Sequence, residues 1–269
     1  MKDRQLSPKE CQRIEEKANE KLAQINKQND ILGEQIFDIL KRHCRVLFYP
    51  LKDDDVWGFY EKIKGNSFIC INSSIDLDKQ VFVAAHELYH LWFNHAEELI
   101  LASELEERDT DIPLEELKAN RFAAEFLVPE MLLRQEIRAS KINDEKIDTA
   151  GIVTLARAFM VPYRTMVKRL HEINMITPAR CSAFLEVSEE EVSRWRKRLG
   201  IELLERTNNI SLDNLVDKAL SAFEQQQINR TRLEYLLSLA HTSPAELGIP
   251  DEEKETKPSD DELDALMED

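Results

Sequence analysis

The run from Val81 to Phe93 constrains this chain most, because it sets three polar side chains in an otherwise apolar segment that is predicted to be a helix from about Asp78 to His95. On a helix, His86 and His90 lie one turn apart on the same face, so both imidazoles can reach one metal ion. Burying two histidines and a glutamate without partners is costly, and a metal would satisfy all three. The pattern predicts metal ligands at His86 and His90, with Glu87 as a general base. The competing interpretation is a pair of hydrogen-bonded core histidines.

A catalytic zinc site needs a third protein ligand and an open position for water. His95 does not fit the His-x-x-Gly-x-x-His extension of such motifs, because Phe93 and Ala96 occupy the positions of its glycine and last histidine. We therefore expect His95 to lie at the surface and close the helix. The oxyanion-stabilising donor stays open among four residues: His43, Tyr49, Tyr60 and Tyr163.

The next predicted helix, from about Pro113 to Leu127, supplies a better third ligand. Glu116 begins a helical row of small or apolar residues that would let this helix approach the first one closely; the others are Ala119, Asn120, Ala123 and Leu127. Geometry alone leaves the neighbouring Glu115 open. Glu125 shares a face with Lys118 and Arg121, so we expect it to form a solvent-exposed ion pair. The predicted metal set is thus His86, His90 and Glu116.

These motifs resemble the ImmA/IrrE family of bacterial zinc metallopeptidases over roughly Arg45 to Leu170. The match joins the His86-Glu87-x-x-His90 helix to a second motif, Glu-x-x-Ala-Asn-x-Phe-Ala-Ala-Glu-x-Leu-x-Pro, at residues 116–129. The resemblance implies that His86, His90 and Glu116 bind zinc and that Glu87 is catalytic. It also implies a protein substrate, typically a helix-turn-helix repressor whose cleavage releases phage, mobile-element or stress genes. The same ligand set accepts Mn²⁺ or Fe²⁺.

Charge and composition narrow the class of protein. With 36 basic and 52 acidic residues the formal net charge is −16, which opposes general binding to a phosphate backbone. Half of that excess lies in residues 251–269, an acidic tail that we expect to be disordered. No apolar run approaches membrane-spanning length and the N-terminus lacks a signal-peptide pattern, so a cytoplasmic location is expected. The four scattered cysteines are interpreted as reduced, buried thiols.

The expected fold is α+β and mostly helical. Short β-branched and aromatic runs at residues 45–49, 56–60 and 67–71 predict a small three-stranded antiparallel sheet beside the His-Glu-x-x-His helix. An N-terminal helix over about 7–44, divided near Gly33, precedes the sheet, and residues 97–111 are interpreted as a solvated loop. The edge of the 67–71 strand could hold a substrate as an added strand.

Four regions are predicted along the chain. Residues 1–140 form a metallopeptidase domain with its N-terminal helix, 141–180 a helix-turn-helix-like segment, 181–250 a helical region that offers a docking surface, and 251–269 the tail. Within the second region, residues 153–170 carry Arg157, Arg164, Lys168 and Arg169. A packed helical hairpin is favoured over a DNA-binding face, because the global charge opposes DNA and the turn lacks its usual glycine.

Three functions compete at this stage. The favoured one is a zinc-dependent, site-specific endopeptidase that cuts a repressor. The alternative is a metal-stabilised module that inactivates its partner by sequestration, against which an intact Glu87 argues, since a structural zinc needs no general base. The third is a DNA-binding regulator with a vestigial peptidase domain.

Overall fold

The computed structural model describes residues 6–52, 56–63, 66–93, 99–101, 113–142, 147–201, 206–208, 210–212, 215–240 and 242–249. Contacts divide the chain into two compact units, Met1–Asp213 and Asn214–Asp269. The predicted tail at 251–269 lies outside the described residues, and so does His95. No described helix is long and apolar enough to cross a membrane. The predicted boundaries at residues 140, 180 and 250 stay predictions.

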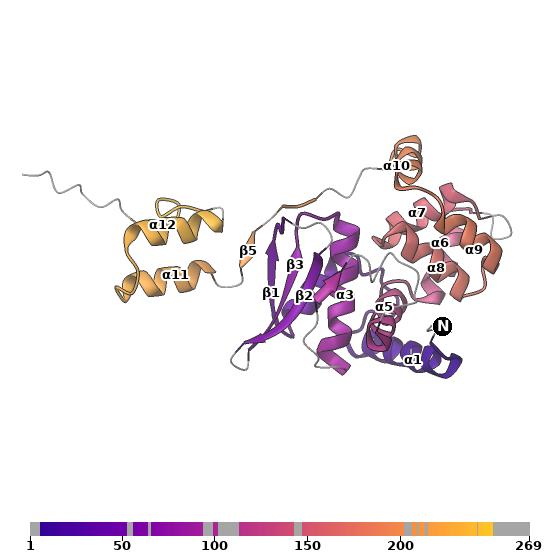
Figure 1. Ribbon diagram of the computed structural model, residues 1–269, viewed down its shortest axis with the longest axis horizontal. Helices are drawn as coiled ribbons and strands as arrows, with labels where there is room; N and C mark the ends of the chain where they lie inside the picture. Colours follow the sequence, from indigo (N-terminus) through magenta and orange to yellow (C-terminus); the bar gives the residue numbers. More distant parts are fainter. Residues whose placement is uncertain are drawn as a thin grey trace, which may run out of the picture. The chain divides into compact units, whose positions relative to one another are not determined.

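The first unit confirms an α+β, mostly helical fold (Figure 1). Its N-terminal part holds α1 (Pro8–Gln24), α2 (Gln35–Lys41), β1 (Arg45–Tyr49), β2 (Val56–Ile63), β3 (Asn66–Asn72), α3 (Leu77–Phe93) and β4 (Leu99–Leu101). The part that follows holds α5 (Leu114–Leu127), α6 (Glu130–Ala139), α7 (Thr149–Phe159), α8 (Tyr163–Glu172), α9 (Pro178–Leu185), α10 (Glu189–Arg198) and β5 (Ser211–Leu212).

The three predicted strands form, but the sheet differs from the prediction. Its order is β4-β2-β3-β1-β5, so it has five strands rather than three. β3 pairs antiparallel with β2 and parallel with β1, so the sheet is mixed and the prediction of an antiparallel sheet was wrong. The reason is that β3 lies between β1 and β2, so those two strands do not pair with each other as in a simple hairpin. Two strands with a third between them are roughly 10 Å apart, and the link between β1 and β2 is long enough to span that distance.

The central place of β3 overturns two further expectations. Both of its edges are occupied, by β1 and β2, so it cannot accept a substrate as an added strand. The segment 97–111, expected to be a loop, contains β4, which pairs with β2 from Val56 to Phe59. The remaining expectation for that segment lies outside the described residues.

The sheet and α3 meet closely at Gly58 of β2. A Cβ atom built there would lie 2.6 Å from Cγ1 of Val83 and 2.8 Å from the carbonyl oxygen of Cys70. At the end of β3, the buried Asn72 fixes the loops that lead to α3, because its Oδ1 accepts from the Leu51 and Ser74 amides and its Nδ2 donates to the Val56 carbonyl. These contacts hold the start of α3 against the sheet.

The remaining helices of this unit share one core with the sheet and α3. α7 and α8 form the predicted hairpin, joined by a turn in which Met160 adopts a left-handed conformation at φ 52°. Gly33, also left-handed at φ +48°, lies against the Met160 side chain and interrupts the N-terminal helix as expected. The N-terminal segment is thereby packed against the hairpin turn.

The second unit contains a hairpin of α11 (Leu215–Glu224) and α12 (Arg230–Leu239). Its buried apolar residues are Ala219, Leu233 and Leu237. Asn229 caps α12 by accepting a hydrogen bond from the Arg232 amide.

Candidate metal centre

Both histidines are on α3, which is buried inside the first unit. It lies between the sheet and α5 (Figure 1), and its residues from Gln80 to His90 are all buried. Both faces of this helix are covered by protein. A helix in such a position needs apolar residues on nearly all sides, as α3 has. His86 is 1% exposed, Glu87 1% and His90 3%.

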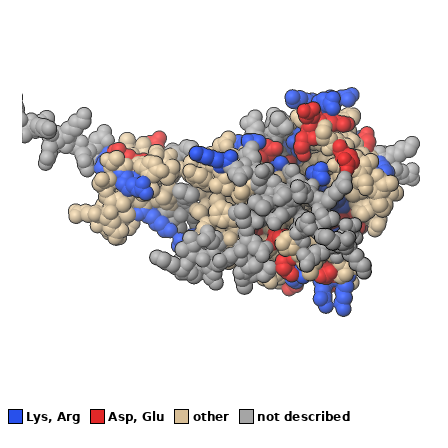
Figure 2. Space-filling view, in the orientation of Figure 1, with Lys and Arg blue, Asp and Glu red and all other residues tan. Residues whose placement is uncertain are grey.

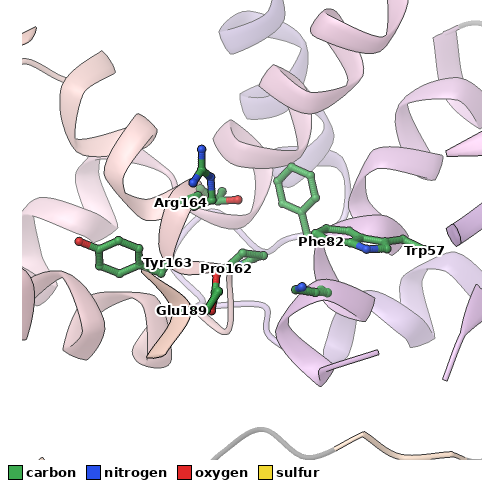
Figure 3. A pocket seen from close by; sticks show the side chains of 8 residues that line it. Trp57, Phe82, Pro162, Tyr163, Arg164 and Glu189 are labelled. Carbon is green, nitrogen blue, oxygen red and sulfur yellow. The ribbon is translucent and has the colours of Figure 1, made fainter. Parts of the chain in front are cut away.

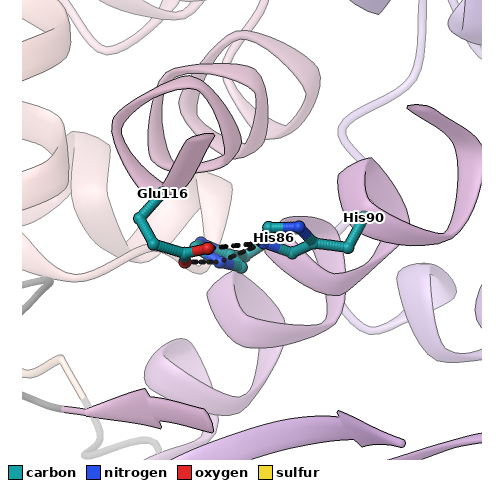
Figure 4. A group of neighbouring side chains, drawn as sticks. All are labelled: His86, His90 and Glu116. Carbon is teal, nitrogen blue, oxygen red and sulfur yellow. Dashed lines mark hydrogen bonds and ion pairs between the residues drawn. The ribbon is translucent and has the colours of Figure 1, made fainter. Parts of the chain in front are cut away.

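Three side chains converge between α3 and α5 (Figure 4). Nε2 of His86 lies 3.0 Å from Nε2 of His90 and 2.9 Å from Oε2 of Glu116, and Nε2 of His90 lies 3.2 Å from Oε1 of Glu116. Ligand atoms held about 2.0–2.1 Å from a tetrahedral zinc ion are about 3.3 Å from one another. The three side chains could therefore hold one metal ion, and among the described residues they form the one such group.

Asn120, one turn after Glu116 on α5, fixes the orientation of His86. Its Oδ1 lies 2.8 Å from Nδ1 of His86, and an amide oxygen only accepts, so Nδ1 carries the proton. The Nε2 lone pair then faces the carboxylate of Glu116. Two acceptors at 2.9 Å repel unless a proton or a metal ion lies between them, so the arrangement fits a metal ion. Sequence reasoning placed Asn120 in the row of Glu116 but gave it no role.

The chemistry of the neighbouring groups points the same way. Burial, opposed by the Glu116 hydrogen bond, lowers the pKa of His86, which keeps the imidazole in its neutral, metal-binding form. Both carboxylate oxygens of Glu87 and Nδ1 of His90 are buried and have no hydrogen-bond partner among the described residues. Burial first, and then the charge of Glu116, raise the pKa of Glu87 well above its ordinary value. A carboxyl group in this state favours holding a proton.

The other acids considered from sequence lie elsewhere. Glu115 accepts hydrogen bonds from the Tyr89 hydroxyl at 3.3 Å and from Lys118 at 2.7 Å, outside the converging group. Glu125 does pair with Arg121, at 2.6 Å, but it is only 4% exposed, so the expectation of a solvent-exposed pair was wrong. Its second partner is the buried Arg169 of α8, which the spacing along α5 could not reveal.

The residues considered as oxyanion donors occupy different surroundings. His43 packs edge-on against Trp92, and Tyr49 is 41% exposed. Tyr60 is buried in β2. Tyr163 lines a separate recess between Trp57 and Phe82 on one side and Pro162 and Arg164 on the other (Figure 3). Phe82 lies one turn before His86 on α3, but His86, His90 and Glu116 do not line this recess.

The basic residues of the α7–α8 hairpin are used mainly inside the protein. Arg169 is 2% exposed and donates to the Val128 carbonyl at 2.9 Å. Arg164 donates to the Leu185 carbonyl at 3.0 Å. Two of the four side chains that suggested a DNA-binding face are thus engaged with neighbouring elements, which favours the packed hairpin.

The cysteines are free thiols, as expected, although only Cys70 and Cys181 are buried. Cys44 is half-buried between α2 and β1 and donates to the Leu40 carbonyl. Burial, and secondarily the nearby charge of Glu87, raise the pKa of Cys44 to about 12. This thiol is therefore neutral near pH 7 in the metal-free protein.

A buried helix with histidines one turn apart, a glutamate beside the first, and a second helix that supplies a carboxylate together define a metallopeptidase-type site. Residues 41–171 match the family model Peptidase_M78, the IrrE N-terminal-like domain, so this part of the chain is similar to that family. The resemblance to ImmA/IrrE proteins is thereby confirmed.

One curated relative comes from a phage. Over 81 residues the chain is 32% identical to the "Uncharacterized immunity region protein 2" of Bacillus phage phi105. The match covers 30% of this chain and 50% of the phage protein, so the chain spans half the length of that relative. No solved structure matches the chain significantly.

Proposed function

We propose that this protein is a zinc-dependent endopeptidase that cuts one peptide bond in a protein substrate, with a helix-turn-helix repressor as the substrate class. The observation that carries the proposal is the convergence of His86, His90 and Glu116 within 4.8 Å, next to the unpartnered carboxyl of Glu87. The family match over residues 41–171 supports the same class of reaction.

His86, His90 and Glu116 would hold the zinc ion. When bound, it would supply Lewis acidity toward a peptide carbonyl and make a water molecule acidic enough to react near neutral pH. Glu87 accepts one proton from the attacking water on its carboxylate and gives it to the nitrogen of the leaving amine as the C–N bond breaks. Asn120 keeps Nδ1 of His86 protonated, which leaves Nε2 free for the metal.

A purely structural zinc site would have no use for Glu87. Such sites normally have four protein ligands, and the described residues supply three. An ionisable side chain that is 1% exposed and without a hydrogen-bond partner costs stability, and that cost is explained when the carboxyl performs proton transfer. This argument favours an enzyme over sequestration.

The repressor as substrate rests on the relatives. The ImmA/IrrE resemblance implies it, and the phage relative is by its name a protein of an immunity region. A cytoplasmic location follows from such a substrate.

The test combines metal content with cleavage. Purified wild-type protein and the Glu87→Gln variant are analysed for bound metal, and each is incubated with helix-turn-helix repressors encoded near its gene. We expect about one zinc ion in both proteins and a loss of cleavage of about 10²–10⁴-fold in the variant. If both proteins bind zinc and hold a repressor without cutting it, sequestration becomes the better account.

A further inference from the structure

The two histidines of the candidate metal centre are held in different ways. Asn120 fixes the ring of His86 by a hydrogen bond to Nδ1, whereas Nδ1 of His90 is buried and has no hydrogen-bond partner among the described residues. Histidines that bind a metal usually donate from their second nitrogen, and that bond fixes the ring. The orientation of His90 must therefore come from the side chains packed around it.

Tyr89 packs against the ring of His90. The two rings meet edge to face, with their centroids 5.6 Å apart and their planes at 84°. Phe122 of α5 contacts the Tyr89 ring from another side, also at 5.6 Å between centroids, and Tyr89 is only 3% exposed. Aromatic contacts at these distances are favourable and depend on angle. A change in the position of Tyr89 would therefore change the orientation of His90.

The hydroxyl of Tyr89 reaches α5 beside the third candidate ligand. It donates to Oε2 of Glu115 at 3.3 Å. Glu115 directly precedes Glu116 in the sequence, just as Tyr89 directly precedes His90. Burial, and then the charge of Glu115, raise the pKa of Tyr89, so the hydroxyl keeps its proton and stays the donor. This bond thus joins α3 and α5 through the immediate neighbours of two converging side chains.

Lys118 holds the other oxygen of Glu115. Its ammonium lies 2.7 Å from Oε1 of Glu115 and 4.0 Å from Oε1 of Glu10 on α1. The surface of α1 that is visible in Figure 2 carries acidic and basic side chains close together. An exposed contact of 4.0 Å in such surroundings contributes little. The part of this connection that can fix a position is therefore the contact of Glu115 with Tyr89 and Lys118.

We propose that Tyr89 is a positioning residue of the metal centre, which orients His90 through its ring and sets the approach of Glu116 through its hydrogen bond to Glu115. This inference rests on the proposed metal site and not on the peptidase reaction. Loss of the hydroxyl alone should change the arrangement of the ligands and leave the fold intact.

The test measures metal binding by the purified, metal-free full chain. Zinc affinity is determined by competition with a chromogenic chelator, and the visible absorption of the Co²⁺-loaded protein reports the geometry of the ligands. Tyr89→Phe keeps the ring and removes the hydroxyl. We expect it to lower zinc affinity about 3–10-fold, the worth of one hydrogen bond, and to shift the Co²⁺ absorption. Glu115→Ala should have the same effects, whereas Glu115→Gln keeps an acceptor for the hydroxyl and should retain most of the affinity.

Tyr163→Phe is the matched control, because Tyr163 is also 3% exposed but lines the separate recess. It should bind zinc and Co²⁺ like the wild type. Combining Tyr89→Phe with Glu115→Ala should weaken binding no further than either change alone, since both remove the same bond. Circular dichroism of the metal-free variants checks that each one folds.

Two results would overturn the proposal: a Tyr89→Phe chain with the zinc affinity and Co²⁺ absorption of the wild type, or losses of the two single variants that add in the double variant. A wild-type chain that binds no metal would overturn the metal centre itself and this inference with it. A chain that binds zinc with these effects but cuts no substrate would contradict the proposed peptidase reaction alone.

Discussion

Oδ1 of Asn120 lies 2.8 Å from Nδ1 of His86, and this contact decides which nitrogen of the imidazole faces Glu116. The two residues are 34 positions apart in sequence and meet because α5 packs directly against α3. The hydrogen bond therefore connects the packing of the two helices to the protonation state of a histidine that could hold a metal ion.

Removal of this hydrogen bond should weaken metal binding. We expect Asn120→Ala to lower zinc affinity about 10–100-fold, measured by competition with a chromogenic chelator, because His86 loses the acceptor that fixes its tautomer. Asn120→Asp keeps an acceptor and should retain most of the affinity. Equal affinities for the alanine variant and the wild type would show that Asn120 does not position His86.

The burial of Glu87 should lower the free energy of unfolding of the metal-free protein by an amount that depends on pH. Its pKa is raised in the folded state, so its contribution to stability is present below its ordinary pKa near 4.5 and is lost as pH rises through the folded pKa. Glutamine does not titrate. In the presence of a chelator, Glu87→Gln should therefore unfold at higher temperature than the wild type above about pH 5, and the difference should grow with pH. Glu115→Gln, at a carboxyl with an exposed side chain, is the control. If the difference in unfolding temperature between Glu87→Gln and the wild type were the same at every pH, the raised pKa of Glu87 would be contradicted.

The ion-pair network between α5 and α8 should be a large stability element. Arg169 bonds Glu125, Glu172 and the Val128 carbonyl, and Arg121 bonds both of the same acids. Arg169→Met leaves the buried Glu125 and the half-buried Glu172 short of a cation, and we expect a cost of about 3–5 kcal/mol in the free energy of unfolding, measured by urea denaturation.

Lys27→Met is the comparison for that variant, because the Lys27–Asp30 pair is exposed and is expected to contribute less than about 1 kcal/mol. Similar losses for the two variants would mean that burial of the network adds nothing.

Gly58 should tolerate no side chain. A Cβ atom there meets the Cys70 carbonyl of the neighbouring strand and the Val83 side chain of α3, and the carbonyl cannot move without disturbing the sheet. We expect Gly58→Ala to cost about 1–3 kcal/mol in urea unfolding. Gly200→Ala is the control for glycine replacement, since nothing lies within 4 Å of a Cβ there and only its left-handed backbone opposes the change. A Gly58 variant as stable as the wild type would show that the sheet and α3 are less closely packed.

Local sequence determined much of what was predicted correctly. The strands over 45–49, 56–60 and 67–71 and the helix around His86 follow from residue periodicity, which depends on a few neighbours. Glu116 could be preferred over Glu115 because the helical row places them on different faces. Asn120 could have been assigned as well, since an amide one turn after a ligand is a usual partner for a histidine.

The errors came from contacts between distant segments. The direction in which β1 pairs depends on β3 entering between it and β2, which no turn motif encodes. Glu125 looked exposed because its neighbours along α5 are basic, whereas its burial is set by Arg169, 44 positions later. The pairing of β4 with β2 likewise joins segments separated by about 40 residues.

The Glu125–Arg169 contact also decides where this protein can be divided. A fragment that ends before α8 would keep the candidate metal centre and Glu87, yet it would leave Glu125 and the Val128 carbonyl without their arginine. We therefore expect the shortest fragment that retains a stable α3–α5 helix pair to run past Glu172. For this reason, any transplant of the candidate metal centre into another protein would have to include the α7–α8 hairpin as well.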